Sequence, residues 1–133
     1  MFNITTLSRI LMLSGAALSP LAQAVTPTAQ LAAYTAQAGA AAQPARGQQL
    51  FTARHGKDWS CASCHTATPN VQGKHASTGK PINPLAPASN PERFADAAKT
   101  EKWFRRNCND VMGRECTAAE KADVLVWLLT LKP

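Results

Sequence analysis

The stretch Trp59-Ser60-Cys61-Ala62-Ser63-Cys64-His65 decides how the rest of the chain is interpreted. Two cysteines separated by two residues and followed directly by histidine form the attachment signature of c-type haem. Each thiol forms a thioether to one vinyl group of the porphyrin, and the imidazole then holds the iron from one side. The motif therefore predicts one covalent haem c bound by Cys61, Cys64 and His65, with His65 as the proximal axial ligand.

Two other kinds of site would use the same cysteines. A four-thiolate zinc site would add Cys108 and Cys116, but seven residues separate that pair, whereas the cysteine pairs of zinc knuckles enclose about two to four. A thioredoxin-like dithiol needs parallel strands, and no segment of the sequence is convincing as a strand. We therefore favour haem over zinc and over a redox dithiol.

The first residues indicate an export signal. One positive charge within residues 1–9 precedes an apolar run at 10–18 and the small-residue cleavage pattern Ala22-Gln23-Ala24. We expect residues 1–24 to be a signal peptide, residues 25–133 to form one monohaem cytochrome c domain, and the exported protein to be periplasmic. No apolar run is long enough to span a bilayer, so no membrane span is expected after cleavage.

The chain is basic, with 14 Lys and Arg against 8 Asp and Glu and a formal net charge of +6. No arginine-rich or aromatic-interleaved pattern accompanies this charge, so nucleic acid is not an expected partner. A positive surface suits an acidic redox partner, or serves solubility alone.

Helical patterns begin directly after the expected cleavage site. Residues 27–42 are rich in alanine and should form a helix that Gly39 ends. The segment 44–54 should form a second helix, in which Gly47 precedes Phe51 by one turn. A glycine at that position would let another helix cross closely.

Further helices are expected towards the end of the chain. Asn90-Pro91-Glu92 has the pattern of a helix start with Asn90 as the N-cap, and Thr100 should cap a further segment over 101–107. Thr117-Ala118-Ala119-Glu120 is a capping box that should begin a last helix running to about residue 131. Helices at both ends with one haem between them predict an all-α protein of the class I cytochrome c fold.

Residues 66–90 contain much glycine and proline and little periodicity, so we expect a long loop that wraps the haem. The backbone carbonyl at Pro84 should accept the second N–H of His65. His75, in the same loop, is expected to be a surface histidine rather than an iron ligand.

The residues alone leave the other side of the iron open. Met112 is the only methionine after the expected signal segment, and a thioether ligand would make an electron carrier. The same residue lies in a tight loop before Gly113, where ordinary packing is equally plausible. Lys99, Lys102 and Arg106 fall near one helix face, which is either solvated or in contact with haem propionates or a partner.

The chain resembles the SHP family (sphaeroides haem protein), small c-type cytochromes that bind oxygen. The likeness covers nearly all of the chain after residue 24, and its most specific part lies towards the C-terminus. The matching segments are Gln30-Leu31 to Tyr34, Arg46-Gly47, Leu50-Phe51, Ser60 to His65, Thr78-Gly79-Lys80, Pro84 to Pro87, Pro91 to Phe94, Glu101-Lys102-Trp103, Arg106 to Asn109, Gly113-Arg114, Cys116-Thr117 and Glu120 to Asp123.

The resemblance implies a ligand set and a disulfide. In that family the asparagine before the first late cysteine is the sixth ligand of the oxidised iron, which corresponds to Asn107, and the two late cysteines form a disulfide, here Cys108 with Cys116. An amide is a weak neutral donor, so reduction should release Asn107 and open a position for a diatomic molecule. Asn109, two residues on, is the nearest competitor for this role.

The function expected from this likeness is an exported cytochrome with His65 and Asn107 on the iron that binds oxygen, nitric oxide or carbon monoxide when reduced. The family is associated with dihaem cytochrome c and b-type cytochromes as redox partners. No distal acid and base pair of the kind peroxidases use is evident, so the sequence does not decide whether the protein is an enzyme that reduces oxygen or another small molecule. The alternative is a plain electron carrier with His65 and Met112 as ligands.

Overall fold

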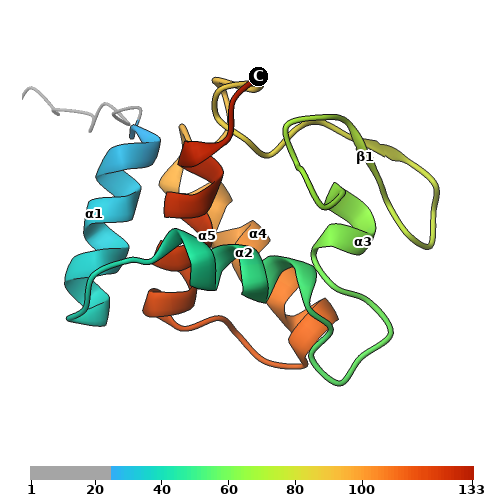
Figure 1. The fold of residues 1–133 in the computed structure, drawn as a ribbon, viewed down its shortest axis with the longest axis horizontal. Coiled ribbons are helices and arrows are strands. Elements are labelled where there is room, and N and C mark those ends of the chain that lie inside the picture. Colours follow the sequence, from blue (N-terminus) through green and yellow to red (C-terminus); the bar gives the residue numbers. More distant parts are fainter. Residues whose placement is uncertain (1–24) are drawn as a thin grey trace, which may run out of the picture.

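The computed structural model describes residues 25–133, and the expected signal peptide lies outside this range. Five helices carry the fold, and the N- and C-terminal helices lie side by side on one side of the molecule (Figure 1). The elements in chain order are α1 (Pro27–Ala38), α2 (Pro44–Thr52), α3 (Ala62–His65), β1 (Gly73–Lys74), β2 (Pro81–Ile82), α4 (Ala97–Met112) and α5 (Ala118–Thr130). The all-α fold class is confirmed.

Helix α1 ends where the sequence predicts. Thr26 caps its start by accepting a hydrogen bond from the backbone N–H of Ala29 at 3.1 Å, and Pro27 occupies the first helical position. Gly39 follows the last turn with φ +64°, a left-handed conformation that glycine adopts without steric cost.

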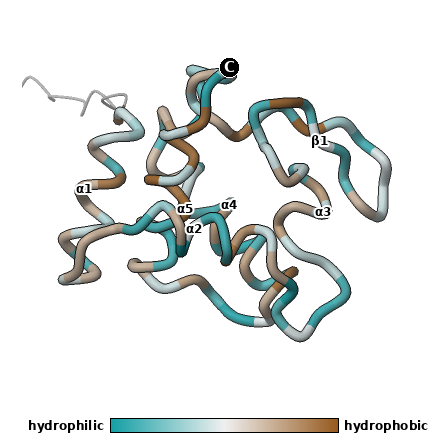
Figure 2. Tube along the Cα trace, in the orientation of Figure 1, coloured by the Kyte–Doolittle hydropathy of each residue, from teal (hydrophilic) through white to brown (hydrophobic). Residues whose placement is uncertain are grey.

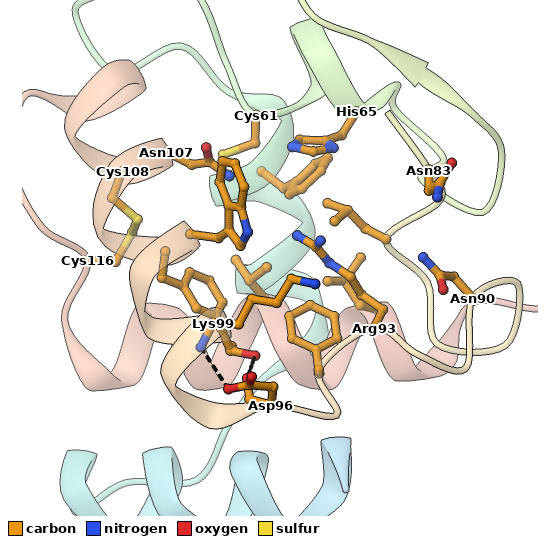
Figure 3. A pocket seen from close by; sticks show the side chains of 18 of the residues that line it. Cys61, His65, Asn83, Asn90, Arg93, Asp96, Lys99, Asn107, Cys108 and Cys116 are labelled. Carbon is orange, nitrogen blue, oxygen red and sulfur yellow. Dashed lines mark hydrogen bonds between the residues drawn. A yellow bond between two sulfur atoms is a disulfide. The ribbon is translucent and has the colours of Figure 1, made fainter. Parts of the chain in front are cut away.

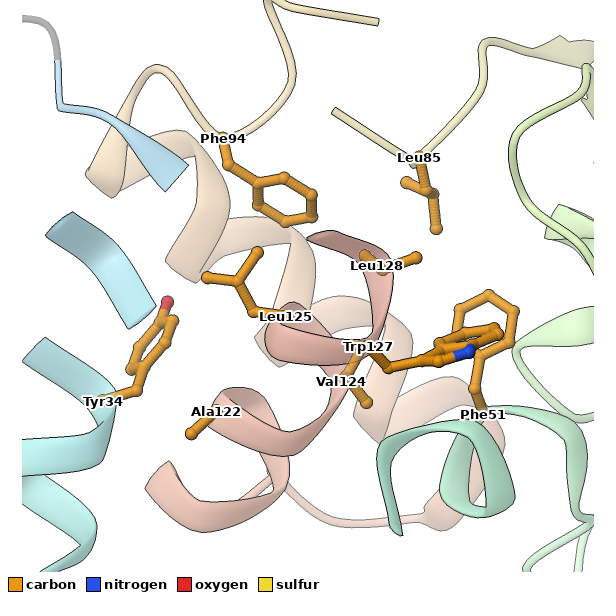
Figure 4. Packing of buried hydrophobic residues seen from close by; sticks show 9 residues of the cluster. All are labelled: Tyr34, Phe51, Leu85, Phe94, Ala122, Val124, Leu125, Trp127 and Leu128. Carbon is orange, nitrogen blue, oxygen red and sulfur yellow. The ribbon is translucent and has the colours of Figure 1, made fainter. Parts of the chain in front are cut away.

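Helix α5 is the centre of the core. The predicted capping box is present, because Thr117 and Glu120 each accept a hydrogen bond from the other's backbone N–H. Part of its trace is coloured as hydrophobic (Figure 2), and the helix packs against α1 and α2. Leu125 is fully buried, and Trp127 stacks at a tilt on Phe51 with ring centroids 5.0 Å apart (Figure 4).

Gly47 brings α2 into close contact with the backbone of α5, as the sequence predicts. A Cβ atom at this position would lie 1.9 Å from the carbonyl oxygen of Asp123. The Asp123 carboxylate also joins the two elements, since it accepts hydrogen bonds from the backbone N–H of Gln43 at 2.6 Å and from Arg46 Nε at 2.7 Å. The crossing therefore needs both a missing side chain and a buried acceptor.

Replacing Gly47 with alanine should destabilise the fold severely. The added methyl group meets backbone rather than a flexible side chain, so the two helices must separate, at a cost of about 3 kcal/mol in the free energy of unfolding. Urea titration followed by circular dichroism measures this loss. Gln48→Ala, on the exposed side of the same helix, is the matched control and should change stability by less than about 0.5 kcal/mol.

The prediction of a helix that begins at Asn90 is wrong. Residues 91–95 form turns, and α4 begins only at Ala97, with Asp96 as the N-cap accepting from the backbone N–H of Lys99 at 2.9 Å. The backbone of Phe94 has φ +64°, which interrupts any helix started by Pro91. Thr100 is likewise no cap, because it lies buried inside α4 and donates its hydroxyl to the Asp96 carbonyl at 2.8 Å.

The long segment after His65 is largely the predicted loop, with one addition. The strands β1 and β2 form a two-residue antiparallel pair in which Gly73 lies opposite Ile82. Strands this short leave no periodicity in the sequence, which explains why none was predicted. Within residues 25–133 no helix is long and apolar enough to cross a membrane.

Candidate haem site

A cavity of about 600 Å³ lies between α2, α3, α4, α5 and the loop that precedes α4. Its walls are mainly apolar, and a few polar side chains point into it (Figure 3). This volume lies within the range of cofactor pockets, about 300–1,000 Å³. The apolar lining residues are Leu50, Phe51, Leu85, Phe94, Ala95, Trp103, Phe104, Val124 and Leu128.

Helix α3 carries the attachment motif and presents Cys61 and His65 to the cavity. Cys64 is partly buried but does not line the cavity, and its Sγ accepts a hydrogen bond from the backbone N–H of Ala76 at 3.3 Å. The β1 strand packs on the back of this turn, because a Cβ atom on Gly73 would lie 2.2 Å from the Cys64 carbonyl oxygen. Thr66, with φ +66°, turns the chain away directly after the histidine.

The surroundings of His65 keep its imidazole neutral. Burial, and after it the positive charge of Arg93, lowers the pKa of His65 from its usual 6.5 to about 4. The Phe51 ring lies beside the imidazole, with centroids 6.2 Å apart. A neutral imidazole is the form that ligates iron, so the ring needs no deprotonation step to act as a ligand at neutral pH. Burial also raises the pKa of the Cys61 thiol, to about 11.

Asn107 lines the same cavity from α4, facing the space that His65 borders from α3 (Figure 3). Its competitor Asn109 is exposed on another face of the helix, where its Nδ2 donates to the Arg105 carbonyl at 2.7 Å. Of the two asparagines, only Asn107 is therefore brought together with the motif.

Met112 does not line the cavity. It is partly buried at the end of α4, and its sulfur lies 3.7 Å from Cys116 Sγ. Cys116 is joined to Cys108 by a disulfide with Cα atoms 5.6 Å apart, and both of these cysteines border the cavity beside Asn107. The methionine thus packs against the disulfide and outside the cavity.

The zinc alternative has no support in the geometry. Within the part of the chain that the structure describes, no three His, Cys, Asp or Glu side chains gather closely enough to hold a metal ion. The disulfide also uses the two thiols that a four-cysteine site would need.

Two loop expectations fare differently. His75 lies outside the cavity, and its Nδ1 accepts from the backbone N–H of Thr78 at 3.3 Å, as expected for a loop histidine. The Pro84 carbonyl instead accepts from Asn90 Nδ2 at 3.0 Å, and within residues 25–133 it makes no hydrogen bond to His65. Leu85, next to it, is buried against the cavity.

The cavity also has a charged side, where Arg93 and Lys99 line it together with Glu92 and Asp96, and sequence reasoning identified its cations only in part. Lys99 lines it, whereas Lys102 and Arg106 do not, and Arg106 instead lies over the Trp103 ring at 5.7 Å. Arg93 lines it too and was missed. The only available signal was a lone basic residue in a segment interpreted as a helix start, and helical spacing gave it no special position.

These residues fit a haem. The apolar lining would take the porphyrin, and a thiol and a neutral imidazole border it from α3 while an amide borders it from α4. Arg93 and Lys99, which also line it, are cations that could pair with carboxylates of the porphyrin. Of these residues, Cys61 and His65 belong to the attachment motif and Asn107 is the one that the family resemblance implies, while Cys64 of the motif does not line the cavity.

Comparison with known proteins identifies the family. Residues 37–128 match the family model described as "Domain of unknown function (DUF1924)". The "Cytochrome c-type protein SHP" of Cereibacter sphaeroides is 47% identical over 127 residues, 92% of this chain and 98% of that protein. "Cytochrome c''" of Methylophilus methylotrophus is 48% identical over 80 residues, 60% of this chain and 56% of that one.

Solved structures agree. Oxidised SHP, described as an oxygen binding cytochrome c, superposes with a TM-score of 0.75 at 48% identity, over 79% of this chain and 96% of that one. Oxidised cytochrome c'' from Methylophilus methylotrophus superposes with a TM-score of 0.73 at 37% identity, over 80% and 95% of the two chains. With a relative at 47% identity along nearly the full length of both chains, this protein belongs to the SHP family of c-type cytochromes, and its cofactor is covalently attached haem c.

Proposed function

We propose that this protein is an exported monohaem cytochrome in which Cys61 and Cys64 attach the haem and His65 and Asn107 are its axial ligands. On reduction Asn107 leaves the iron, and oxygen or nitric oxide then binds in its place. The observation that carries the proposal is that Asn107, rather than Met112 or Asn109, shares the cavity with His65.

Two related proteins support this direction. The SHP structure is that of an oxygen binding cytochrome c, and a solution structure of cytochrome c'' concerns the structural basis of haem-ligand detachment. This chain superposes on the latter with a TM-score of 0.70 at 37% identity. Oxygen binding is thus described for one relative with this fold and haem-ligand detachment for another.

Each residue has a separate task in this proposal. The haem iron supplies the one-electron change and the coordination position. Thioethers from Cys61 and Cys64 fix the ring position, and the neutral His65 imidazole donates from the α3 side. Asn107 offers only a neutral amide oxygen, a weak donor that a small change in iron charge is enough to release. Phe104 and Val124 help keep the cavity apolar and limit the entry of water.

Electron exchange would take place with other cytochromes, among them dihaem cytochrome c and b-type cytochromes. The net charge of +6 favours partners with an acidic surface. The rival function, a plain carrier with Met112 on the iron, would require the end of α4 to rearrange so that the thioether leaves its contact with Cys116.

Reduction of the purified protein tests the proposal. The ferrous protein should become high-spin and five-coordinate and should bind carbon monoxide and nitric oxide without a slow ligand-dissociation phase, because only a weak amide has to leave. Absorption spectroscopy and stopped-flow mixing measure both properties. The ferric protein should lack the charge-transfer band of methionine ligation, and a low-spin ferrous protein that rejects carbon monoxide would refute the proposal in favour of the plain carrier.

The Cys108–Cys116 disulfide is part of the same site. It closes a short loop immediately after Asn107. In the chain-entropy model, a cross-link across such a loop lowers the entropy of the unfolded chain and so stabilises the folded protein by about 2.5 kcal/mol. Nonreduced exported protein should therefore yield the two linked peptides in mass spectrometry. Detection of both residues as free thiols would contradict this prediction.

A further inference from the structure

Arg93 is a cation in a largely apolar cavity, and it forms no ion pair within residues 25–133. Its side chain is partly buried, and desolvation lowers its pKa. Among the salt bridges and side-chain hydrogen bonds of residues 25–133, none involves its guanidinium, which lies over the Phe94 ring with Cζ 5.4 Å from the ring centroid. Removing a guanidinium from water without an anionic partner is unfavourable, so this position calls for an anion.

The two carboxylates that line the same cavity do not meet that need. Glu92 and Asp96 also line the cavity, but neither lies within 4.0 Å of the Arg93 nitrogens. Asp96 already uses its carboxylate to cap α4 through the backbone N–H of Lys99. Within residues 25–133 the guanidinium is therefore left without a paired carboxylate, and an anion bound in the cavity could pair with it.

The backbone holds Arg93 in this place at some cost. Phe94 adopts φ +64°, a conformation that is unfavourable for an aromatic residue, and Gln30 Nε2 from α1 donates a hydrogen bond to its carbonyl. The backbone N–H of Arg93 donates to the Asn90 carbonyl at 2.9 Å. The turn is thus anchored on both sides, and it directs the guanidinium into the cavity on the side of His65 (Figure 3).

We propose that Arg93 binds a haem propionate and that this pairing sets the reduction potential. A planar guanidinium matches a carboxylate through two parallel hydrogen bonds. Its charge offsets the propionate charge, which would otherwise favour the more positive ferric state. The proposal rests on the haem occupying this cavity, which is part of the proposed function, but it is independent of Asn107.

The test compares the midpoint potentials of the haem-loaded protein and of three variants: Arg93→Leu, Arg93→Lys and the control Arg54→Leu. Arg54 is exposed, so removing its charge has little effect in salt. Arg93→Leu should shift the one-electron equilibrium at least tenfold towards the ferric form, about 59 mV lower. Arg93→Lys should retain most of the potential because it keeps the charge.

Equal shifts in Arg93→Leu and Arg54→Leu would overturn the assignment. So would a wild-type potential that depends on phosphate concentration and loses this dependence in Arg93→Leu, because a soluble anion would then occupy the site. If Arg93→Leu fails to fold, the propionate bending band in the resonance Raman spectrum tests whether Arg93 pairs with a propionate. It should differ between wild type and Arg93→Lys, and an unchanged band would refute the pairing. Pyridine haemochrome and carbon monoxide binding report separately on attachment and on the Asn107 site.

Discussion

Replacing Asn107 with alanine should change the ferric absorption spectrum strongly and leave the ferrous spectrum almost unchanged. In the proposed oxidised state the amide holds the sixth position, so its loss would leave that position to water or to no ligand. In the proposed reduced state the amide is no longer bound, so the variant and the wild type would present the same five-coordinate iron. Absorption spectra of both redox states and electron paramagnetic resonance of the ferric state measure the difference.

Two controls make this result specific. Met112→Ala should disturb neither redox state beyond a packing effect, because its sulfur contacts Cys116 outside the cavity. Asn109→Ala removes the same side chain from the exposed face of α4 and should leave both spectra unchanged. If removal of Met112, and not of Asn107, converts the iron to high-spin, the protein is a plain electron carrier.

Replacing both Cys61 and Cys64 with alanine should abolish covalent haem attachment, the largest effect we expect from any change in the chain. In the proposed site the thioethers of Cys61 and Cys64 are the covalent links, and without them the apolar walls would hold a porphyrin only reversibly. Denaturing gels stained for haem peroxidase activity, together with pyridine haemochrome spectra, should give one c-type haem per wild-type chain and none for the variant.

The matched control uses the other cysteine pair. Cys108→Ala with Cys116→Ala removes the disulfide and two thiols but leaves α3 untouched. This variant should keep its haem while its stability falls and its Asn107 side loosens. Full haem attachment in the Cys61 and Cys64 variant, or zinc without haem in wild type from a host able to mature cytochromes, would overturn the central assignment.

The sequence was most informative where one local rule decides the structure. Gly39 ends α1 because a left-handed residue stops a helix, the capping box of Thr117 begins α5, and Gly47 marks a close crossing. Haem as the cofactor followed in the same way from the spacing of two cysteines and a histidine.

Prediction failed where tertiary contacts override local preference. Asn90 and Pro91 carry a good helix start, but the left-handed Phe94, whose carbonyl is bound by Gln30 from α1, prevents the helix. Because this segment was predicted as a helix, two features of the site were not predicted. They are Arg93 in the cavity and the hydrogen bond from Asn90 to the Pro84 carbonyl. The spacing of residues could likewise not decide between Asn107 and Met112 as the ligand, because both lie on α4. Only the packing of this helix shows that Asn107 lines the cavity and that Met112 does not.

The packing of α5 on α1 and α2 has a kinetic consequence. These helices come from opposite ends of the described chain, and the haem-attachment segment lies in the long stretch that their contact encloses. Closing so large a loop is entropically expensive, and contacts distant in sequence form slowly. We therefore expect a newly made chain to have an interval before its ends dock, during which Cys61 and Cys64 would remain accessible to the machinery that attaches the haem. The position of α5 at the end of the chain thus favours haem attachment before the terminal helices dock.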